Sequence, residues 1–312
     1  MVPMGIEATE RRNPKSKEIH KMTSLQIVRL INKEDRKVPL AVSKEATRIA
    51  RIVDAVTNGL KSGGRVFYVG AGTSGRLGVV DAAEMPPTFG LSTTKFQGIV
   101  AGGWSALRRS VEGAEDDEGA ASKELDRRGI CSKDILIGLS ASGRTPFVLA
   151  AMRAARRIGA KRFGITCNPK SEMACLADET IILRVGPEII AGSSRMKCGT
   201  AQKMVLNMIS TASMVRLGRA WEGLMVNLEA RSRKLQKRAM RIVSEVARVD
   251  HLSAKKALDD ANGNVRLAIV MLRCGVSIRK AREILADTEA DIEKIVSSSQ
   301  RARKKAPDSQ WK

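Results

Sequence analysis

The 312-residue chain has few aromatic residues, only 3% of the total, so its core must be aliphatic and rich in alanine. No apolar run approaches the ~18 residues that a membrane-spanning helix needs. The first residues include acidic side chains and no apolar stretch of the kind found in secretory signals. We therefore expect a cytoplasmic protein that does not enter a membrane.

Histidine and paired cysteines are also scarce. The two histidines, His20 and His251, are far apart in the sequence, and the five cysteines are scattered without a C-x-x-C pair. This pattern disfavours a disulfide framework, a zinc site and a histidine triad, and it fits reduced thiols. Acid–base chemistry therefore falls to carboxylates or lysine.

Acidic residues are too few to balance the charge, with 33 Asp and Glu against 55 Lys and Arg and a net charge of +22. The excess is densest in residues 231–312, which hold 20 basic and 10 acidic residues, and it ends in a basic tail at 301–312. Such a surface can attract nucleic acid. Since the chain contains no recognised nucleic-acid-binding module, we favour solvated helix faces or a generally basic proteome and expect no nucleic-acid partner.

Short apolar segments alternate with longer helical stretches through the middle of the chain. This alternation predicts a doubly wound, mainly parallel α/β sheet. The expected strands lie at 66–69, in "FQGIVAGG", in "DILIGL", in "KRFGITCNP" and in "ETIILRV".

Helical patterns occupy both ends of the chain. Near the start we expect two helices, the first capped by Thr23 or Ser24, with Pro39 between them and Gly63-Gly64 after the second. Near the end, breaks at "ANGN" and "CGVS" predict a small module of three short helices. The domains are then an N-terminal helical segment at 1–55, the sheet domain at 56–220, a C-terminal helical module at 221–300 and the tail.

Small and hydroxyl-bearing residues follow two of the expected strands, in "GAGTSGR" and in "SASGRT". In open α/β sheets such turns lie where ligands bind, and their N–H groups and hydroxyls suit a phosphate. The candidate phosphate-binding residues are Thr73, Ser74, Ser140, Ser142 and Thr145. Glycine and serine also form plain turns and caps, but the S-G-R repeat at 74–76 and 142–144 indicates one structural solution used twice. The lysine of a Walker A loop is absent, and no ribose-binding carboxylate supports a dinucleotide site.

A second polar cluster, "AGSSRMKCGTAQK", precedes a long apolar helix and supplies the candidates Ser193, Ser194 and Lys203. It could simply cap the helix. However, basic side chains near a helix N-terminus oppose the helix dipole, so a bound anion would help to explain them.

Two carboxylates are candidates for acid–base chemistry. Glu84 lies in "DAAEMPPTFG", where Pro86 and Pro87 are expected to stop the helix. Glu115 lies in the acidic run "VEGAEDDEGA", most of which we expect to be solvated surface. A helix and a strand between the two could return the chain to the same end of the sheet, where the carboxylates would form an acid–base pair.

Taken together, these stretches resemble the N-acetylmuramic acid 6-phosphate etherases, bacterial cell-wall recycling enzymes built on the sugar isomerase fold. The resemblance runs from "TERRNP" to "NGNVRLAIVML" and is carried by "FYVGAGTSGRLGVVDAAEMPPTFG", "VEGAEDD", "SASGRTPFV", "CNP" and "GSSRMKCGTAQKMVLNMISTASM". The family usually has a serine and a cysteine beside the first glutamate, where this chain has Ala83 and Met85.

The resemblance implies cleavage of a D-lactyl ether by elimination and water addition, without a metal or organic cofactor. The products would be N-acetylglucosamine 6-phosphate and D-lactate. By their places in the motifs, Glu84 matches the family's proton donor and Glu115 its second acid–base residue. An apolar wall at Met85, Pro86 and Pro87 would raise the pKa of Glu84 and let it donate.

The resemblance also implies a homodimer whose active site draws on both subunits, and a C-terminal module shaped like a ubiquitin-associated domain that serves for packing. Two alternatives share the fold. A phosphosugar isomerase would need the phosphate turns but not the two glutamate motifs. A non-catalytic phosphosugar-binding regulator would bind without turnover, and no helix-turn-helix is evident near the start of the chain.

Overall fold

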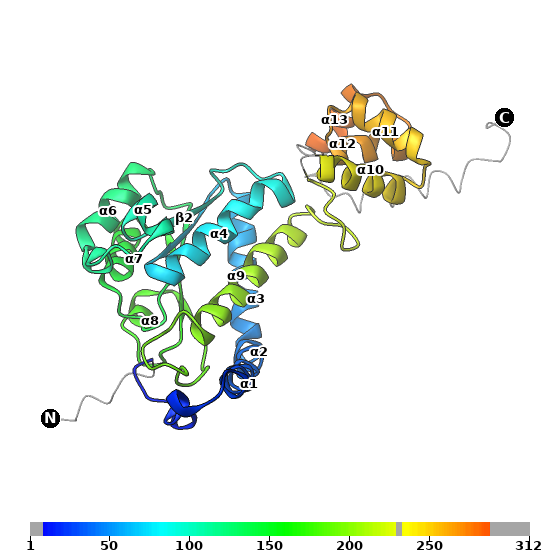
Figure 1. The fold of residues 1–312 in the computed structure, drawn as a ribbon. Coiled ribbons are helices and arrows are strands. Elements are labelled where there is room, and N and C mark those ends of the chain that lie inside the picture. Colours follow the sequence, from blue (N-terminus) through cyan, green and yellow to red (C-terminus); the bar gives the residue numbers. More distant parts are fainter. Residues whose placement is uncertain (1–8, 229–232, 288–312) are drawn as a thin grey trace. The chain divides into compact units, whose positions relative to one another are not determined.

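The computed structural model describes residues 9–228 and 233–287 (Figure 1). These residues fall into two compact units, with bounds Met1–Ala83 and Thr93–Ser213 for the first and Glu84–Ser92 and Met214–Lys312 for the second. The predicted basic tail at 301–312 lies outside the described residues. The predicted domain limit at residue 55 falls inside helix α3, Ala46–Lys61.

A five-stranded sheet forms the centre of the first unit, and all its strand pairs are parallel, as the sequence predicts. The order is β2-β1-β3-β4-β5, and β1 and β3 are buried over their whole length. Because the direction of winding reverses between β1 and β3, the loops after these two strands border the crevice where doubly wound sheets bind ligands. The bounds are β1 Val66–Gly70, β2 Phe96–Val100, β3 Ile135–Leu139, β4 Lys161–Thr166 and β5 Glu179–Ile182.

Helices cover both faces of this sheet (Figure 1). One face carries α3, α4 (Gly72–Phe89) and α9 (Lys197–Arg216); the other carries α6 (Glu118–Arg127), α7 (Pro146–Ile158) and α8 (Met173–Leu176). Two glycines show how closely the layers pack. A Cβ on Gly78 of α4 would lie 2.8 Å from the Tyr68 Cβ, and one on Gly138 of β3 would lie 2.9 Å from a Val148 methyl group on α7. Both faces of the central strands are therefore dry, as a parallel sheet requires.

The N-terminal region contains three α-helices where the sequence predicts two. Two 3-10 turns, η1 Pro14–Ser16 and η2 Ile19–Lys21, come first, followed by α1 Ser24–Asp35, α2 Lys37–Ser43 and α3. Thr23 caps α1 in a full capping box, which confirms one of the two predicted caps. Pro39 does not separate helices but lies in the first turn of α2, where its missing N–H would have no partner anyway. Helix α3 ends before Gly63, whose φ is +86°.

The prediction that Pro86 and Pro87 stop their helix is wrong. Helix α4 continues through both prolines to Phe89, and Gly90, with φ +59°, follows its end. Proline has a helical φ, but it lacks the hydrogen bond to the carbonyl four residues earlier and its ring crowds that carbonyl. The N–H of Gly90 still reaches the Pro86 carbonyl at 2.9 Å, so the last turn is held despite the two lost bonds.

The second unit contains the helical module, and its core is aliphatic. The predicted three short helices are confirmed as α11 His251–Asp260, α12 Val265–Cys274 and α13 Ile278–Asp287, and α10 Arg233–Ala247 precedes them. Asp250 and Asn264 cap α11 and α12, and Gly275 ends α12 with φ +64°. Within residues 9–228 and 233–287, no helix combines the length and apolarity needed to cross a lipid bilayer.

Candidate functional site

The first predicted phosphate turn forms the start of α4, directly after β1. A Cβ on Gly75 would lie 2.4 Å from the Gly70 carbonyl oxygen, so only glycine lets the helix begin this close to the strand. Thr73 and Ser74 therefore lie in the first turn of α4, half-buried at the carboxyl end of the sheet. The first N–H groups of any α-helix have no intrahelical partners and carry a partial positive charge. This end of α4 can bind an anion.

The second turn brings two hydroxyls next to that of Ser140, which is 3% exposed. The Ser140 Oγ lies 2.8 Å from the Thr145 Oγ1 and 3.3 Å from the Ser142 Oγ, and it accepts a 2.9 Å hydrogen bond from the Gly143 N–H. The predicted residues after β3 are thus brought together. Ser142 and Thr145 are half-buried, so their oxygens can still meet a ligand.

The two S-G-R segments do not share one structure, contrary to the prediction. Residues 74–76 are helical, whereas Gly143 lies in a loop before α7 with φ +68°. A Cβ on Gly143 would lie 2.2 Å from the Ser171 Cβ, which excludes other residues there. The same three letters therefore serve a helix start in one place and a left-handed turn in the other.

Two residues that the sequence did not single out brace the second turn. The Thr166 Oγ1 donates to the Ala141 carbonyl at 3.1 Å, and the Asn168 Nδ2 donates to the Ser142 carbonyl at 3.1 Å. Both lie at or just after the end of β4, and both are buried. Asn168 lies in the "CNP" stretch that carries part of the family resemblance. This stretch could have indicated the role of Asn168, because a buried asparagine usually forms hydrogen bonds.

Helix α9 brings the polar cluster "AGSSRMKCGTAQK" to the first phosphate turn. The Ser74 Oγ donates to the Gln202 Oε1 at 2.8 Å, and a Cβ on Gly199 would lie 3.3 Å from the Thr73 Cγ2 and 3.6 Å from the Ser194 carbonyl oxygen. The loop before α9, with half-buried Ser193 and Ser194, therefore adjoins the start of α4. Gln202 was part of the predicted cluster but had no assigned role.

The expectation of a bound anion for the basic residues of this cluster is wrong for Lys197. Lys197 is buried and donates to the carboxylate of Glu34 at 3.0 Å. The N-terminus of α9 is capped by another buried carboxylate, because the N–H groups of Lys197 and Cys198 donate to the two oxygens of Glu188 at 3.1 and 2.9 Å. The protein supplies its own anions here, so no ligand is needed to explain the charge.

Lys203 lies six residues further along α9 and remains half-exposed. Its Nζ contacts the Asn207 Oδ1 and lies 4.0 Å from the Asp81 Oδ1. Asp81 also accepts hydrogen bonds from the Tyr68 hydroxyl at 3.1 Å and the Ser210 hydroxyl at 3.2 Å. Burial, and then the Asp81 charge, raise the pKa of Tyr68 well above its usual value. The hydrogen bond between Asp81 and Ser210 thus links α4 to α9 behind the polar turns.

Glu84 is exposed, and Met85 does not form part of the apolar wall that was predicted beside it. Met85 is 3% exposed and points away from the solvent face of α4 that carries Glu84. Adjacent residues on a helix point about 100° apart, so the methionine cannot wall the carboxyl group.

Glu115 is also exposed, in the 3-10 turn η3 Ala114–Asp116. Helix α5, Gly103–Arg108, separates this turn from β2. A Cβ on Gly102, two residues after β2, would lie 3.2 Å from the Ala114 Cβ. The loop with Glu115 thus folds back to the carboxyl end of the sheet. Glu84 lies 12 residues beyond Gly72 on α4, about 18 Å along the helix from that end, so the pairing of the two glutamates stays a prediction.

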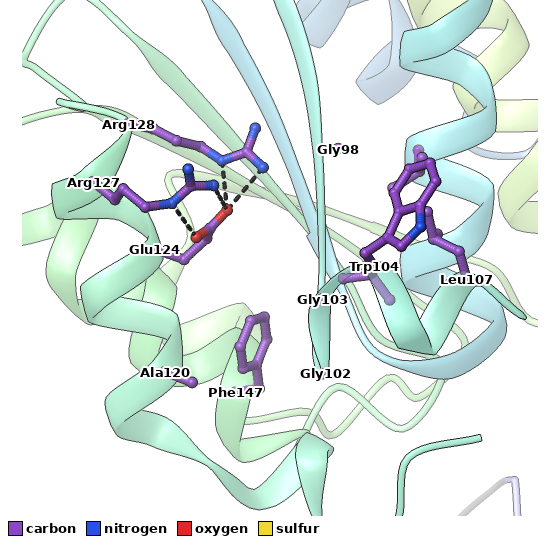
Figure 2. Close-up of a pocket in the computed structure, with 12 residues that line it drawn as sticks. Gly98, Gly102, Gly103, Trp104, Leu107, Ala120, Glu124, Arg127, Arg128 and Phe147 are labelled. Atoms are coloured by element: carbon purple, nitrogen blue, oxygen red, sulfur yellow. Dashed lines mark hydrogen bonds and ion pairs between the residues drawn. The ribbon is translucent and has the colours of Figure 1, made fainter. Parts of the chain in front are cut away.

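A cavity of about 600 Å³ lies along the outer edge of β2 (Figure 2). Figure 2 shows Arg127 and Arg128 converging on Glu124 at one side and Trp104 with Leu107 at the other. The lining includes none of the predicted site residues. We therefore place the candidate site at the polar turns and not in this cavity.

The chain is similar to known proteins over most of its length. The model of the glucokinase regulatory protein N-terminal SIS domain matches residues 48–156, and that of the SIS domain matches residues 123–212. N-acetylmuramic acid 6-phosphate etherase 1 of Bacillus licheniformis is 45% identical over 94% of this chain and 97% of its own length. The N-acetylmuramic acid 6-phosphate etherase of Histophilus somni is 47% identical over 90% of this chain and 93% of its own length. A phosphoheptose isomerase from Francisella tularensis is 18% identical, with a TM-score of 0.47, over 62% of this chain and 98% of its own.

Proposed function

The chain belongs to the N-acetylmuramic acid 6-phosphate etherase family, and we propose that Glu84 and Glu115 carry out the acid–base chemistry of its reaction. The enzyme cleaves the D-lactyl ether of N-acetylmuramic acid 6-phosphate, and the products are N-acetylglucosamine 6-phosphate and D-lactate. This is a reaction of peptidoglycan recycling. The observation that carries the assignment is the near-complete length of the match with the curated etherases.

Elimination followed by addition of water accounts for these products. When the sugar ring opens, the C2 proton lies α to an aldehyde and becomes acidic. A base removes this proton, and an acid protonates the ether oxygen at C3 as lactate leaves. Water then adds at C3, and C2 regains a proton. We assign protonation of the leaving oxygen to Glu84 and the second acid–base role to Glu115.

The polar turns are proposed to hold the phosphate and the sugar. Support comes from the start of α4 at Thr73 and Ser74, from the hydroxyls gathered after β3, and from the adjoining loop with Ser193 and Ser194. Helix N-terminal N–H groups and hydroxyls are the usual protein donors to phosphate oxygens. Lys203, half-exposed on α9, would add a positive charge. Fixing the phosphate orients the sugar and lowers the entropic part of the barrier.

We further propose that the enzyme works as a homodimer with a shared active site. Val80 and Glu84 are four residues apart on α4 and share one face of the helix. Val80 is 49% exposed and Glu84 is also exposed, so this face presents an apolar side chain next to a proposed catalytic carboxyl group. A second subunit covering this face would exclude water from Glu84, which its own Met85 does not do.

The isomerase and regulator alternatives are less favoured, because the curated relatives that match the chain almost end to end are etherases. The test is release of D-lactate from N-acetylmuramic acid 6-phosphate by the purified protein and by Glu84→Gln and Glu115→Gln. A parent protein that binds the sugar phosphate but releases no lactate would overturn the proposal in favour of the regulator.

A further inference from the structure

A buried charge cluster lies outside the proposed catalytic groups, at the end of α1. The Glu34 side chain is fully buried, yet its carboxylate receives hydrogen bonds from Lys197 at 3.0 Å, Lys15 at 3.0 Å, Lys37 at 2.7 Å and Asn13 at 3.1 Å. Burial alone would raise the pKa of Glu34, but these donors together hold it well below its usual range. The carboxylate is therefore charged in the folded protein.

Lys197 connects this carboxylate to the loop before α9, which we call the α9 loop, residues 185–196. Its side chain is 1% exposed, and its ammonium group donates three hydrogen bonds. One goes to Glu34, one to the Val185 carbonyl at 3.0 Å and one to the Pro187 carbonyl at 2.7 Å. An ammonium group has three N–H donors, so every one of them is in use.

The N-terminal segment holds the same loop from the other side. The Asn13 Nδ2 donates to the Pro187 carbonyl at 3.2 Å as well as to Glu34. The Thr9 carbonyl accepts a hydrogen bond from the Gly192 N–H at 3.0 Å. The "TERRNP" stretch, which the catalytic proposal leaves without a role, thus fastens the α9 loop at two points.

The α9 loop positions Ser193 and Ser194, two of the proposed substrate-binding residues. Gly192 precedes Ser193 and Ser194, and the Ser194 carbonyl accepts the Gly199 N–H at 3.0 Å. Gly199 in turn lies against Thr73 at the start of α4. A displacement of the Val185 or Pro187 carbonyl would therefore move the residues proposed to hold the substrate.

We propose that Glu34 and Lys197 are positioning residues that fix the α9 loop for substrate binding, an inference that rests on the proposed function. A buried ion pair is a poor source of stability, because apolar side chains of similar size usually serve as well or better. Lys197 also donates hydrogen bonds to the Val185 and Pro187 carbonyls, and an apolar side chain cannot make these bonds.

Three variants separate positioning from stability: Glu34→Gln, Lys197→Met and the double variant Glu34→Gln/Lys197→Met. Lys197→Met leaves a buried carboxylate without its buried partner, so it should unfold at a lower temperature and bind substrate poorly. The double variant removes both charges and should regain most of the thermal stability. It cannot restore the bonds to Val185 and Pro187, so its KM should stay about 10- to 100-fold above the wild-type value, with kcat within about threefold.

Arg65 and Asp134 give a matched control. They form an ion pair at the amino ends of β1 and β3, and Asp134 is 1% exposed. Arg65 also donates to two carbonyls, those of Arg128 at 2.9 Å and Gly129 at 2.6 Å. The variant Arg65→Met/Asp134→Asn removes a similar pair and similar carbonyl bonds far from the polar turns. It should change the unfolding temperature but leave KM within about twofold.

A double variant of Glu34 and Lys197 that is stable and has a wild-type KM would overturn the positioning role. Ser142→Ala and Ser194→Ala, measured in the same assay, keep this failure distinct from failure of the proposed phosphate turns, since they leave the ion pair intact. If the serine variants raise KM and the double variant does not, only positioning is wrong. If the double variant raises KM and the serine variants do not, positioning stands and the serine assignment is wrong.

Discussion

Ser74, in the first turn of α4, and Gln202, in the second turn of α9, are joined by a 2.8 Å hydrogen bond between the Ser74 Oγ and the Gln202 Oε1. The Gln202 side chain is buried, and among the described residues its Nε2 has no hydrogen-bond partner. A buried donor without an acceptor costs about 1–3 kcal/mol. Because this donor lies beside the proposed phosphate turn, a substrate oxygen can satisfy it.

Gln202→Glu should raise KM for the sugar phosphate by about tenfold or more, with a smaller effect on kcat. Glutamate keeps an acceptor for Ser74 but replaces the free N–H donor with a negative charge that repels phosphate. Steady-state kinetics measure the effect. The same change at Gln97, on the edge strand β2, is the control. An unchanged KM in the Gln202 variant would remove this residue from the site.

Ser140 and Ser142 should respond differently to loss of their hydroxyls. Ser140→Ala removes the acceptor of the Gly143 N–H and the partner of Thr145, and should lower the free energy of unfolding by about 1–3 kcal/mol while raising KM. Ser142→Ala, at a half-buried position, should raise KM with less than about 1 kcal/mol of destabilisation. Urea unfolding and kinetics on both variants test this. Equal destabilisation would contradict the central place of Ser140 in the turn.

Glu34 should make stability depend on pH. Burial opposes its charge, but the hydrogen bonds from Lys37, Lys197, Lys15 and Asn13 lower its pKa from 4.5 in the folded state. A lowered pKa contributes stability that is fully present above the unfolded value and is lost as pH falls. The difference in unfolding free energy between the parent and Glu34→Gln should therefore be constant from pH 7 to about 5. It should shrink below about pH 4.5.

Denaturant unfolding of both proteins from pH 3 to 7 measures this difference. Glu112→Gln, which removes an exposed carboxylate, is the control for general effects of charge. A difference that grows on acidification would contradict the account of Glu34, because it would mean that the carboxylate binds its proton more tightly in the folded state.

The five thiols should fall into distinct classes of reactivity. Cys131 and Cys175 are exposed, whereas Cys167 and Cys198 are buried. A hydrogen bond with Cys167, then burial and the nearby Glu188 carboxylate, raise the pKa of Cys198 well above its usual value. Since the thiolate is the reactive form, Cys167 and Cys198 should react with a disulfide reagent only after unfolding. Mass spectrometry identifies the modified cysteines. Rapid modification of Cys167 or Cys198 in the folded protein would contradict their burial.

The alternation of strands and helices was enough to predict the parallel sheet and the polar turns, because buried parallel strands are continuous apolar runs with ligand-binding loops after them. It could not predict that the S-G-R letters at 74 and 142 adopt different conformations. Gly143 has a positive φ and lies against Ser171, 28 residues away, whereas Gly75 is helical and lies against the end of β1. Local sequence does not contain these long-range contacts.

The charged residues show the same limit. A lysine beside a helix N-terminus indicates a nearby anion. The anions are the carboxylates of Glu34 and Glu188, and Glu34 is 163 positions from Lys197. Met85 was expected to wall Glu84, but the helical rotation between neighbours separates them. The continuation of α4 through Pro86 and Pro87 likewise depends on packing, which outweighs the two missing hydrogen bonds.

We propose that Glu84 and Glu115 perform the acid–base chemistry of lactyl ether cleavage. Both are exposed, so Glu84→Gln and Glu115→Gln should fold with unchanged unfolding temperatures. The most direct measurement is the rate of D-lactate release from N-acetylmuramic acid 6-phosphate by the parent and the two variants, with Glu112→Gln as the control. We predict lactate release by the parent and by Glu112→Gln, and a fall in kcat of about 10²- to 10⁴-fold in each of the other two variants. Wild-type kcat in either the Glu84 or the Glu115 variant would contradict the account.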